Sequence, residues 1–355
     1  MTDPFATFRG PTWGASRTPK PDRLVVDVHA HVSVPQAAAL ATTHLDPAQD
    51  PRLRYADPRT TAYNRLMLAK IAGKLTDPSE RLSDMDAMGV DMQLLSIAPP
   101  QYFYQADADL GAELARIQND RIAEIAASNP QRFLAMGTLP LQAPAEAQAE
   151  LCRIVDDLGV RGLQINTNVQ GRDLDHPDIG WLWHEAERRR LLVIMHPHGF
   201  SSAERLWDHY LTNVIGLPLE SCIALSRLIL SGVLERHPRL RLLVVHGGGY
   251  LPFYVARSDH AWQQRPETRR HIARPPSSYL RMVHFDTTTH SPEAVAALVS
   301  RYGAERVLLG TDYPYDMGVT DPLSLLAAAD LDEHQAGLVL GDNAVRLLGL
   351  DRAVV

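Results

Sequence analysis

The feature that most constrains the fold of this 355-residue chain is a regular alternation of short apolar runs and helical patterns. Several of the runs are apolar throughout, which is typical of parallel strands buried on both faces. The eight predicted strands cover residues 23–32, 92–100, 132–141, 161–169, 190–199, 240–249, 282–290 and 306–316. Helical periodicity is clearest over residues 111–130, 143–159, 218–238 and 291–303. Eight strand–helix units predict an α/β fold of the (β/α)₈ TIM-barrel type, with a doubly wound open sheet as the structural alternative.

Two connections are much longer than ordinary loops: residues 33–80 follow the first predicted strand, and residues 200–217 follow the fifth. Both leave the carboxyl end of a strand, where barrel active sites form, so we expect them to line a pocket. Residues 1–22 are polar and contain several prolines, and they are expected to form an extended N-terminal arm. We therefore predict a single barrel domain over residues 23–355, with 33–80 as an insertion that lines the pocket.

The first predicted strand carries His29 and His31, which share a face because alternate side chains of a strand point the same way. Two such imidazoles are either hydrogen-bonded core residues or ligands of one metal ion. Other candidates follow the carboxyl ends of later strands: His196, His198, His246, His284, Asp286, His290 and Asp312. A barrel brings these strand ends into one ring. Imidazole and carboxylate donors so placed predict a site for a divalent ion, Zn²⁺ or a related metal, with one position left for water or substrate.

Four motifs, VDVHAHV, IMHPHG, VVHGGGYLPF and LLGTDYPYD, resemble those of the amidohydrolase superfamily. Within it the chain resembles the decarboxylase branch, typified by 2-amino-3-carboxymuconate 6-semialdehyde decarboxylase and γ-resorcylate decarboxylase. The similarity runs from about residue 24 to about residue 350. It implies a metal-binding set of His29, His31, His196 and Asp312. It also implies that His246 is catalytic as the acid/base residue beside the metal, together with Asp312.

The lysine content bears on how many metal ions the site holds. Many hydrolytic amidohydrolases bridge two metals with a carboxylated lysine on the fourth strand. Here the only lysines are Lys20, Lys70 and Lys74, so no lysine lies on the predicted fourth strand. A lysine-bridged pair of metals is therefore excluded, and one divalent ion is expected, Zn²⁺ first and Mn²⁺ as the alternative.

The resemblance also suggests substrate-binding residues. Arg257 and Arg265 resemble arginines that the muconate enzyme contributes across a dimer interface, and a guanidinium matches a carboxylate bidentately. We therefore expect a homodimer in which Arg257 acts in trans. His198, His209 and Tyr315 stand where the muconate enzyme has aromatic pocket residues, and are assigned to substrate binding. The insertion offers further cations, none of which can be aligned: Arg52, Arg54, Arg59, Arg65 and Lys70.

These features predict a metal-dependent, non-oxidative decarboxylase, a carbon–carbon lyase, without an organic cofactor. The expected substrate is a small aromatic, unsaturated cyclic or muconate-like carboxylic acid. A metal can hold the substrate oxygens, and an imidazole can move a proton at neutral pH. Whether water adds or a ring carbon is protonated before CO₂ leaves stays open. The alternatives are a mononuclear hydrolase or hydratase acting on a lactone or enol acid, and a non-catalytic metal-binding barrel.

Charge and hydropathy exclude other classes of partner. The formal net charge is −7 and the pI about 6.1, with no basic run, so a nucleic-acid partner is not expected. No apolar stretch looks long enough for a membrane span, and no signal-peptide core is visible near residue 1. We therefore expect a cytoplasmic protein.

Overall fold

The structure is a computed structural model that describes residues 18–200 and 202–350. Most of the predicted N-terminal arm lies outside the described residues. In the part that is described, the Thr18 amide donates a hydrogen bond to Ser324 Oγ, and Lys20 forms an ion pair with Asp91. This end of the arm is therefore attached to the rest of the chain, and the division into arm and domain stays a prediction.

Each of the eight predicted strand segments contains a strand. The strands are β1 Val26–Val32, β2 Met92–Ile97, β3 Phe133–Ala135, β4 Gly162–Ile165, β5 Asn168–Val169, β6 Arg172–Asp173, β7 Leu192–Met195, β8 Arg241–Val244, β9 His284–Asp286 and β10 Val307–Leu308. One parallel sheet has the order β1-β2-β3 and a second has the order β10-β9-β8-β7-β4. Strands β5 and β6 pair with each other antiparallel. The α/β fold with parallel strands is confirmed.

The two parallel sheets meet at their edges through single bridges rather than full ladders. Ala30 of β1 bridges to Tyr313, and Gly137 bridges to Leu163 of β4. Strand β10 is short because the residues after it bond elsewhere: the Leu309 amide donates to the Val339 carbonyl, and the Asp312 amide donates to the carbonyl of His29. The predicted single closed barrel is therefore represented by two sheets in contact, not by one continuous ladder.

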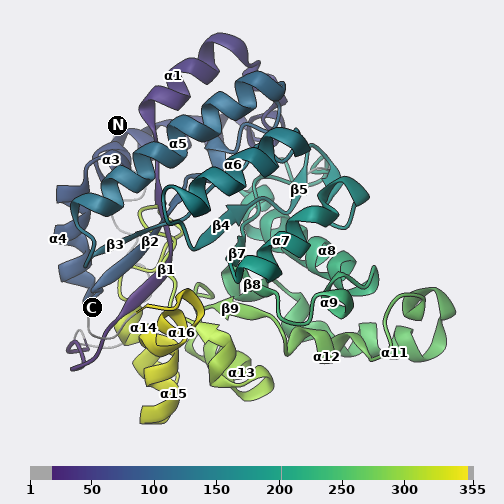
Figure 1. The fold of residues 1–355 in the computed structure, drawn as a ribbon. Helices are drawn as coiled ribbons and strands as arrows, with labels where there is room; N and C mark the ends of the chain where they lie inside the picture. The colour runs from purple at the N-terminus through teal and green to yellow at the C-terminus, as the bar shows by residue number, and fades with distance from the viewer. Residues whose placement is uncertain (1–17, 201, 351–355) are drawn as a thin grey trace.

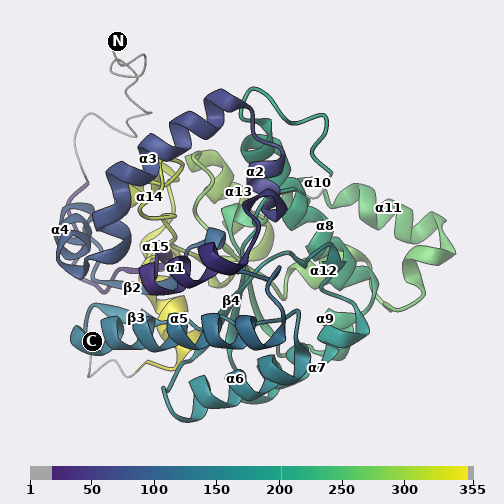
Figure 2. The ribbon, with the colours of Figure 1, turned by 90° about the horizontal axis from the view of Figure 1, so that it is seen from above.

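Helices surround the sheets (Figures 1 and 2). The helices along the first half of the chain are α1 Pro35–His44, α2 Pro51–Arg54, α3 Pro58–Thr76, α4 Pro78–Met88, α5 Ala108–Ser128, α6 Pro144–Asp156 and α7 Gly180–Arg189. Those of the second half are α8 Leu217–Leu230, α9 Val233–Arg236, α10 Leu251–Tyr254, α11 Ala256–Gln264, α12 Pro276–Leu280, α13 Pro292–Tyr302, α14 Pro322–Ala328, α15 Glu333–Gly337 and α16 Asn343–Leu348. Both views show α11 projecting from the body of the molecule.

The insertion after β1 is helical rather than a loop. Its longest element, α3, begins after Asp57, whose carboxylate accepts hydrogen bonds from the amides of Arg59 and Thr60, and a proline stands in its first turn. The segment after β7 meets this insertion, because the Asp57 amide donates to the carbonyl of Trp207. The two long connections predicted to line a pocket therefore touch each other on the same side of the sheets.

One helix corrects the expectation that no apolar stretch is long enough to span a membrane. The helical stretch Thr212–Leu230, formed by the π-helical segment η4 (Thr212–Gly216) and α8, has the length and mean hydropathy for it. It also carries Glu220, which is buried, and Arg227, which pairs with Asp175. These charged residues contact neighbouring segments, so the helix packs as part of the wall of the fold. The absence of a membrane partner and the cytoplasmic location stay predictions.

Candidate metal centre

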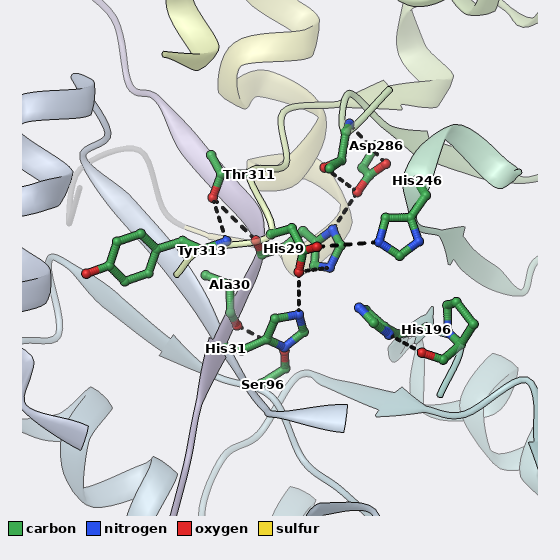
Figure 3. A network of polar contacts seen from close by, with 12 residues as sticks. His29, Ala30, His31, Ser96, His196, His246, Asp286, Thr311 and Tyr313 are labelled. Atoms are coloured by element: carbon green, nitrogen blue, oxygen red, sulfur yellow. Dashed lines mark hydrogen bonds and ion pairs between the residues drawn. The ribbon is translucent and has the colours of Figure 1, made fainter. Parts of the chain in front are cut away.

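Four polar residues from three separate parts of the chain converge at the carboxyl ends of the strands. His29 and His31 lie on β1, His196 follows β7, and Asp312 follows β10. One donor atom from each lies within 4.8 Å of the others, and all four side chains are buried. Figure 3 shows the rings of His29, His31 and His196 turned toward one another. The structure thus brings together the four residues that the family resemblance assigned to the metal.

The arrangement fits a metal ion because it leaves buried nitrogen atoms without hydrogen bonds. His31 Nε2 lies 3.1 Å and His29 Nε2 3.3 Å from Asp312 Oδ1. Within the described residues, His29 Nε2 and His196 Nε2 are buried and make no hydrogen bond. Buried polar atoms are almost always satisfied, so these two nitrogens indicate a missing partner. Three imidazole nitrogens and one carboxylate oxygen are a donor set that a single divalent ion prefers.

Charge is unevenly distributed over these four side chains. Burial opposes a charge on His29, but Asp312 and Asp286 outweigh it and raise its pKa. Burial, with the neighbouring His29, lowers the pKa of His31, and burial together with the other imidazoles lowers that of His196. Burial would raise the pKa of Asp312, but the imidazoles around it hold it well below its usual range. The centre therefore favours an ionised carboxylate beside neutral His31 and His196, as metal binding requires, whereas His29 would have to release a proton when a metal ion binds.

The second nitrogen of each imidazole is also held in place. His29 Nδ1 lies 2.7 Å from Asp286 Oδ2, with both side chains fully buried. His196 Nδ1 lies 2.8 Å from the carbonyl oxygen of Pro197, and His31 Nδ1 lies 3.4 Å from Ser96 Oγ. In a neutral imidazole, holding Nδ1 as a donor leaves the Nε2 lone pair free to bind a metal ion. These contacts therefore fix the ring orientation that metal binding needs.

Gly310 allows His29 and Asp286 to come this close. A Cβ atom at residue 310 would lie 2.9 Å from the Cβ atoms of both His29 and Asp286. Real Cβ contacts are longer, so any side chain here would push β1 away from β9. The glycine two residues before Asp312 is therefore part of the local packing that builds the centre.

Asp27 connects the segments that carry the metal-binding residues through hydrogen bonds. Its carboxylate accepts hydrogen bonds from the amide of His29 (3.0 Å), the amide of Thr311 (3.0 Å), Thr311 Oγ1 (2.6 Å) and Gln93 Nε2 (2.9 Å). Gln93 in turn accepts a hydrogen bond from the buried Arg81, which also donates to the carbonyl of His31. Burial raises the pKa of Asp27 to about 6, against these hydrogen bonds. This network joins β1 to the segment that carries Asp312.

His246 stands beside the centre rather than in it. It follows β8 in the short helical turn η5 (His246–Gly248), and its Nε2 lies 3.6 Å from Asp312 Oδ2. Its backbone has φ +54°, and that of Asp312 has φ +61°, a region that non-glycine residues rarely adopt and that clusters at functional sites. After it, Gly249 has φ +68°, and a Cβ there would lie 2.4 Å from the Pro218 carbonyl oxygen. The glycines following His246 thus serve close backbone packing.

A cavity of about 480 Å³ opens over the centre. Its lining includes His196, His246 and Asp312, and also His198 and Tyr315, which the family resemblance placed at the substrate. The insertion contributes one face of α3, with residues at helical spacing: Thr60, Asn64, Met67 and Leu68. Part of the predicted insertion thus lies at the cavity, and the assignment of the whole of residues 33–80 to a pocket-lining insertion stays a prediction.

Three predicted substrate residues lie outside this cavity. The side chain of His209 is 80% exposed and pairs with Asp208, while its neighbour Tyr210 lines the cavity instead. The backbone has positive φ at both residues. Arg257 and Arg265 are exposed at α11, and Arg265 pairs with Glu267. Within one chain, none of the three reaches the centre.

The candidate cations of the insertion do not line the cavity either. The cavity lining contains none of Arg54, Arg59, Arg65 and Lys70. The side chain of Arg52 lies outside the described residues. Sequence reasoning assigned no role to other residues that do line it, including Asn64 and Asp316, and His290, named there only as a candidate strand-end ligand, lines the cavity instead. Helical spacing along α3 could have marked Asn64, but only the docking of α3 shows which face it presents. His284 is buried against Arg306 and lies outside the centre.

The fold and the site together define a class of α/β metalloprotein. Its parallel strands carry a buried centre of three histidines and one aspartate at their carboxyl ends, with a fourth imidazole beside it. The chain belongs to the amidohydrolase family, whose model matches residues 26–350. It is similar to a 2-amino-3-carboxymuconate-6-semialdehyde decarboxylase from Dictyostelium discoideum, with 34% identity over 78% of this chain and 77% of the relative. It is also similar to a γ-resorcylate decarboxylase from Rhizobium sp., with 31% identity over 77% of this chain and 87% of the relative.

A solved structure shows the same fold. The crystal structure of a 5-carboxyvanillate decarboxylase from Sphingomonas paucimobilis matches with a TM-score of 0.79 and 29% sequence identity. The match covers 92% of this chain and 99% of that one. The family resemblance drawn from the four motifs is therefore confirmed.

Proposed function

We propose that this protein is a metal-dependent, non-oxidative decarboxylase of a small aromatic or unsaturated carboxylic acid. The observation that carries the proposal is the His29, His31, His196 and Asp312 centre, which lies at the base of a cavity with His246 beside it. The relatives at 34% and 31% identity are both decarboxylases, which favours this reaction over hydrolysis of a lactone or hydration of an enol acid.

The chemistry needs a proton at carbon. When CO₂ leaves, the bond between the carbon and its carboxylate breaks, the electron pair stays on that carbon, and a proton replaces the carboxylate. A bound divalent ion would hold the substrate oxygens and draw charge toward itself. We assign the proton transfer to His246, because its Nε2 stands 3.6 Å from Asp312 Oδ2 and its ring lines the cavity. Asp312 and the three imidazoles would hold that ion beside the His246 ring.

The test is release of CO₂ from a panel of hydroxybenzoates, carboxyvanillates and muconate semialdehydes by metal-loaded protein, with the product mass measured. Loss of CO₂ supports the proposal, whereas gain of water or no turnover across the panel contradicts it. His29→Ala should lose metal and activity together. His246→Ala should keep the metal and lose activity by about 10²-fold or more. His334→Ala, an exposed histidine on α15, is the matched control and should keep both.

We propose Zn²⁺ as the resident metal, with Mn²⁺ as the competing assignment. Three imidazole nitrogens with one carboxylate oxygen suit Zn²⁺, while a larger share of oxygen ligands would favour Mn²⁺. Metal analysis of the purified protein, followed by reconstitution of the metal-free protein with each ion, decides between them. Turnover with Mn²⁺ and none with Zn²⁺ would reverse the assignment.

We further propose a homodimer in which Arg257 reaches the cavity of the partner. Within the described residues no arginine or lysine lines the cavity, and Arg257 is exposed on α11, which projects from the body of the molecule (Figures 1 and 2). Apolar side chains are exposed on the neighbouring helices: Val214, Ile215, Ile223, Tyr250 and Tyr254. Such a surface is typical of a subunit interface.

Mixing two inactive variants tests the proposal. Arg257→Ala and His246→Ala are each expected to be inactive as homodimers. In a mixed dimer one cavity has its own His246 and the partner's intact Arg257, whereas the other cavity lacks both. Random mixing makes about half of the dimers mixed, so about a quarter of the wild-type activity should return. If mixed dimers form without any recovery, Arg257 does not act in trans.

We also infer that the eight strands close into one barrel. The two bridged edges carry further hydrogen bonds, from the His31 amide to the Tyr313 carbonyl (2.8 Å) and from the Gly137 amide to the Gly162 carbonyl (2.9 Å). Hydrogen exchange tests this, because both amides should be protected as strongly as those inside the sheets. Rapid exchange at either edge would indicate an open sheet.

A further inference from the structure

The cavity lining has an unusual charge balance for a site that receives an anion. Among the described residues that line it, the only carboxylates are Asp312 and Asp316, and no arginine or lysine is present. Asp312 belongs to the metal centre and bonds with its histidines. Asp316 therefore stands alone as an acidic side chain at the cavity wall, four residues beyond the centre.

The loop that carries Asp316 is held in one conformation. The Tyr315 amide donates to the Asp312 carbonyl (3.1 Å), and the Gly318 amide donates to the Tyr315 carbonyl (2.9 Å). The Val319 amide closes the loop by donating to the Thr311 carbonyl (2.7 Å). From the other side, His290, which also lines the cavity, bonds to the backbone of Met317. A carboxylate on so constrained a loop has a defined position relative to the metal centre.

The surroundings of Asp316 supply no compensating cation. No arginine, lysine or histidine within the described part of the chain forms an ion pair with it. Asp316 lines the cavity but remains exposed to solvent. Desolvation of its carboxyl, and secondarily the charge of Asp312, raise its pKa, while the amides of Asp316 and Met317 act in the opposite direction. The cavity lining also includes Thr60 and Asn64 of α3, which are neutral. Beside the metal centre the cavity thus offers hydrogen-bonding groups and one further acid.

We propose that Asp316 is a specificity-determining residue that selects substrates with a hydrogen-bond donor, a hydroxyl or amino group, at this position and rejects those with a second carboxylate there. This proposal rests on the decarboxylase assignment and narrows its substrate class. The substrate carboxylate that is lost faces the metal centre, where the positive charge is. A second carboxylate beside Asp316 would be repelled by a like charge at short range, which is unfavourable. A hydroxyl or amine there would instead donate a charge-assisted hydrogen bond.

The test is a binding measurement, so it does not depend on turnover. Metal-loaded wild type and the variant Asp316→Asn are titrated calorimetrically with 2-hydroxybenzoate and with its ring-substituted hydroxy, amino and carboxy derivatives. For at least one ring position, Asp316→Asn should weaken binding of the hydroxy or amino derivative by about 5- to 10-fold. It should tighten binding of the carboxy derivative by about 10-fold, and leave 2-hydroxybenzoate itself within about twofold.

Asp157→Asn is the matched control, because it makes the same change at an exposed residue that follows α6, outside the cavity. It should bind every ligand as wild type does. If Asp316→Asn changes the affinity of all ligands equally, Asp316 acts on the metal centre or pairs with a partner's arginine, and the proposal is overturned. Unchanged affinities overturn it as well. Failure of the decarboxylase assignment would be seen separately, as no CO₂ release by wild type that still binds these acids.

Discussion

The hydrogen bond between Asp286 and His29 predicts how strongly the centre depends on a residue that does not touch the metal. Asp286 Oδ2 accepts from His29 Nδ1 (2.7 Å) and from Thr288 Oγ1 (2.9 Å), and Oδ1 accepts from the Gly247 amide (2.8 Å). In Asp286→Asn, Oδ1 can keep the Gly247 bond, so the new amide NH₂ faces His29. His29 Nδ1 must then become an acceptor, which moves its proton to Nε2 and blocks the atom that binds metal.

Loss of such a supporting contact typically lowers metal affinity by about 10- to 100-fold, or about 1.4 to 2.7 kcal/mol. We expect the upper part of that range, because both side chains are fully buried and water cannot replace the carboxylate.

The assay is competition with a chromophoric chelator for Zn²⁺ and Mn²⁺, with circular dichroism to confirm the fold. Thr288→Val is the control, since it removes the other donor to Oδ2 but keeps the carboxylate on His29. It should change affinity by less than about threefold. If Asp286→Asn binds metal within the same limit, the tautomer argument is wrong.

Three further changes test the support of the centre. Asp27→Ala removes the acceptor of four hydrogen bonds, including two from Thr311, and should lower the free energy of unfolding by about 3 kcal/mol in urea denaturation; a loss under about 1 kcal/mol would contradict it. Gly310→Ala places a Cβ between β1 and β9 and should cost about 1–3 kcal/mol and weaken metal binding, measured by the same two assays; an unchanged protein would show that the strands can move apart. Burial, together with Arg306, lowers the pKa of His284 from 6.5 to about 3. Between these pH values His284 is protonated in the unfolded chain but neutral in the native protein. Stability should therefore fall by about 1.4 kcal/mol per pH unit as the pH drops from 6.5 toward 3, and His284→Gln should lack this slope; parallel pH profiles would refute the assignment.

Apolar runs and helical periodicity were sufficient to predict the eight strand segments and the helices over residues 111–130, 143–159, 218–238 and 291–303. Each predicted strand contains an observed one, because runs of Val, Leu and Ile report directly on burial. The insertion over residues 33–80 was predicted to line the pocket, but its helices α1, α2 and α3 were not predicted, and the cavity-lining residues on α3 were not identified. His209 was misplaced for a related reason: a turn with positive φ at His209 and Tyr210 shifts which side chain faces inward, and no pattern in the sequence reports that.

Sequence alone determined the types and order of the groups at the metal centre, since His29, His31, His196 and Asp312 stand in motifs at strand ends. It also excluded a lysine-bridged pair of metals, because a missing residue type is visible without any structure. Only the tertiary structure decided the partners that hold those groups. Asp27 bonds to Thr311 and His29 to Asp286, pairs separated by more than 250 residues, and such contacts depend on how strands dock rather than on local spacing. The same docking placed Asp316 at the cavity wall and Arg257 outside it, because the cavity lies between elements that no local pattern connects.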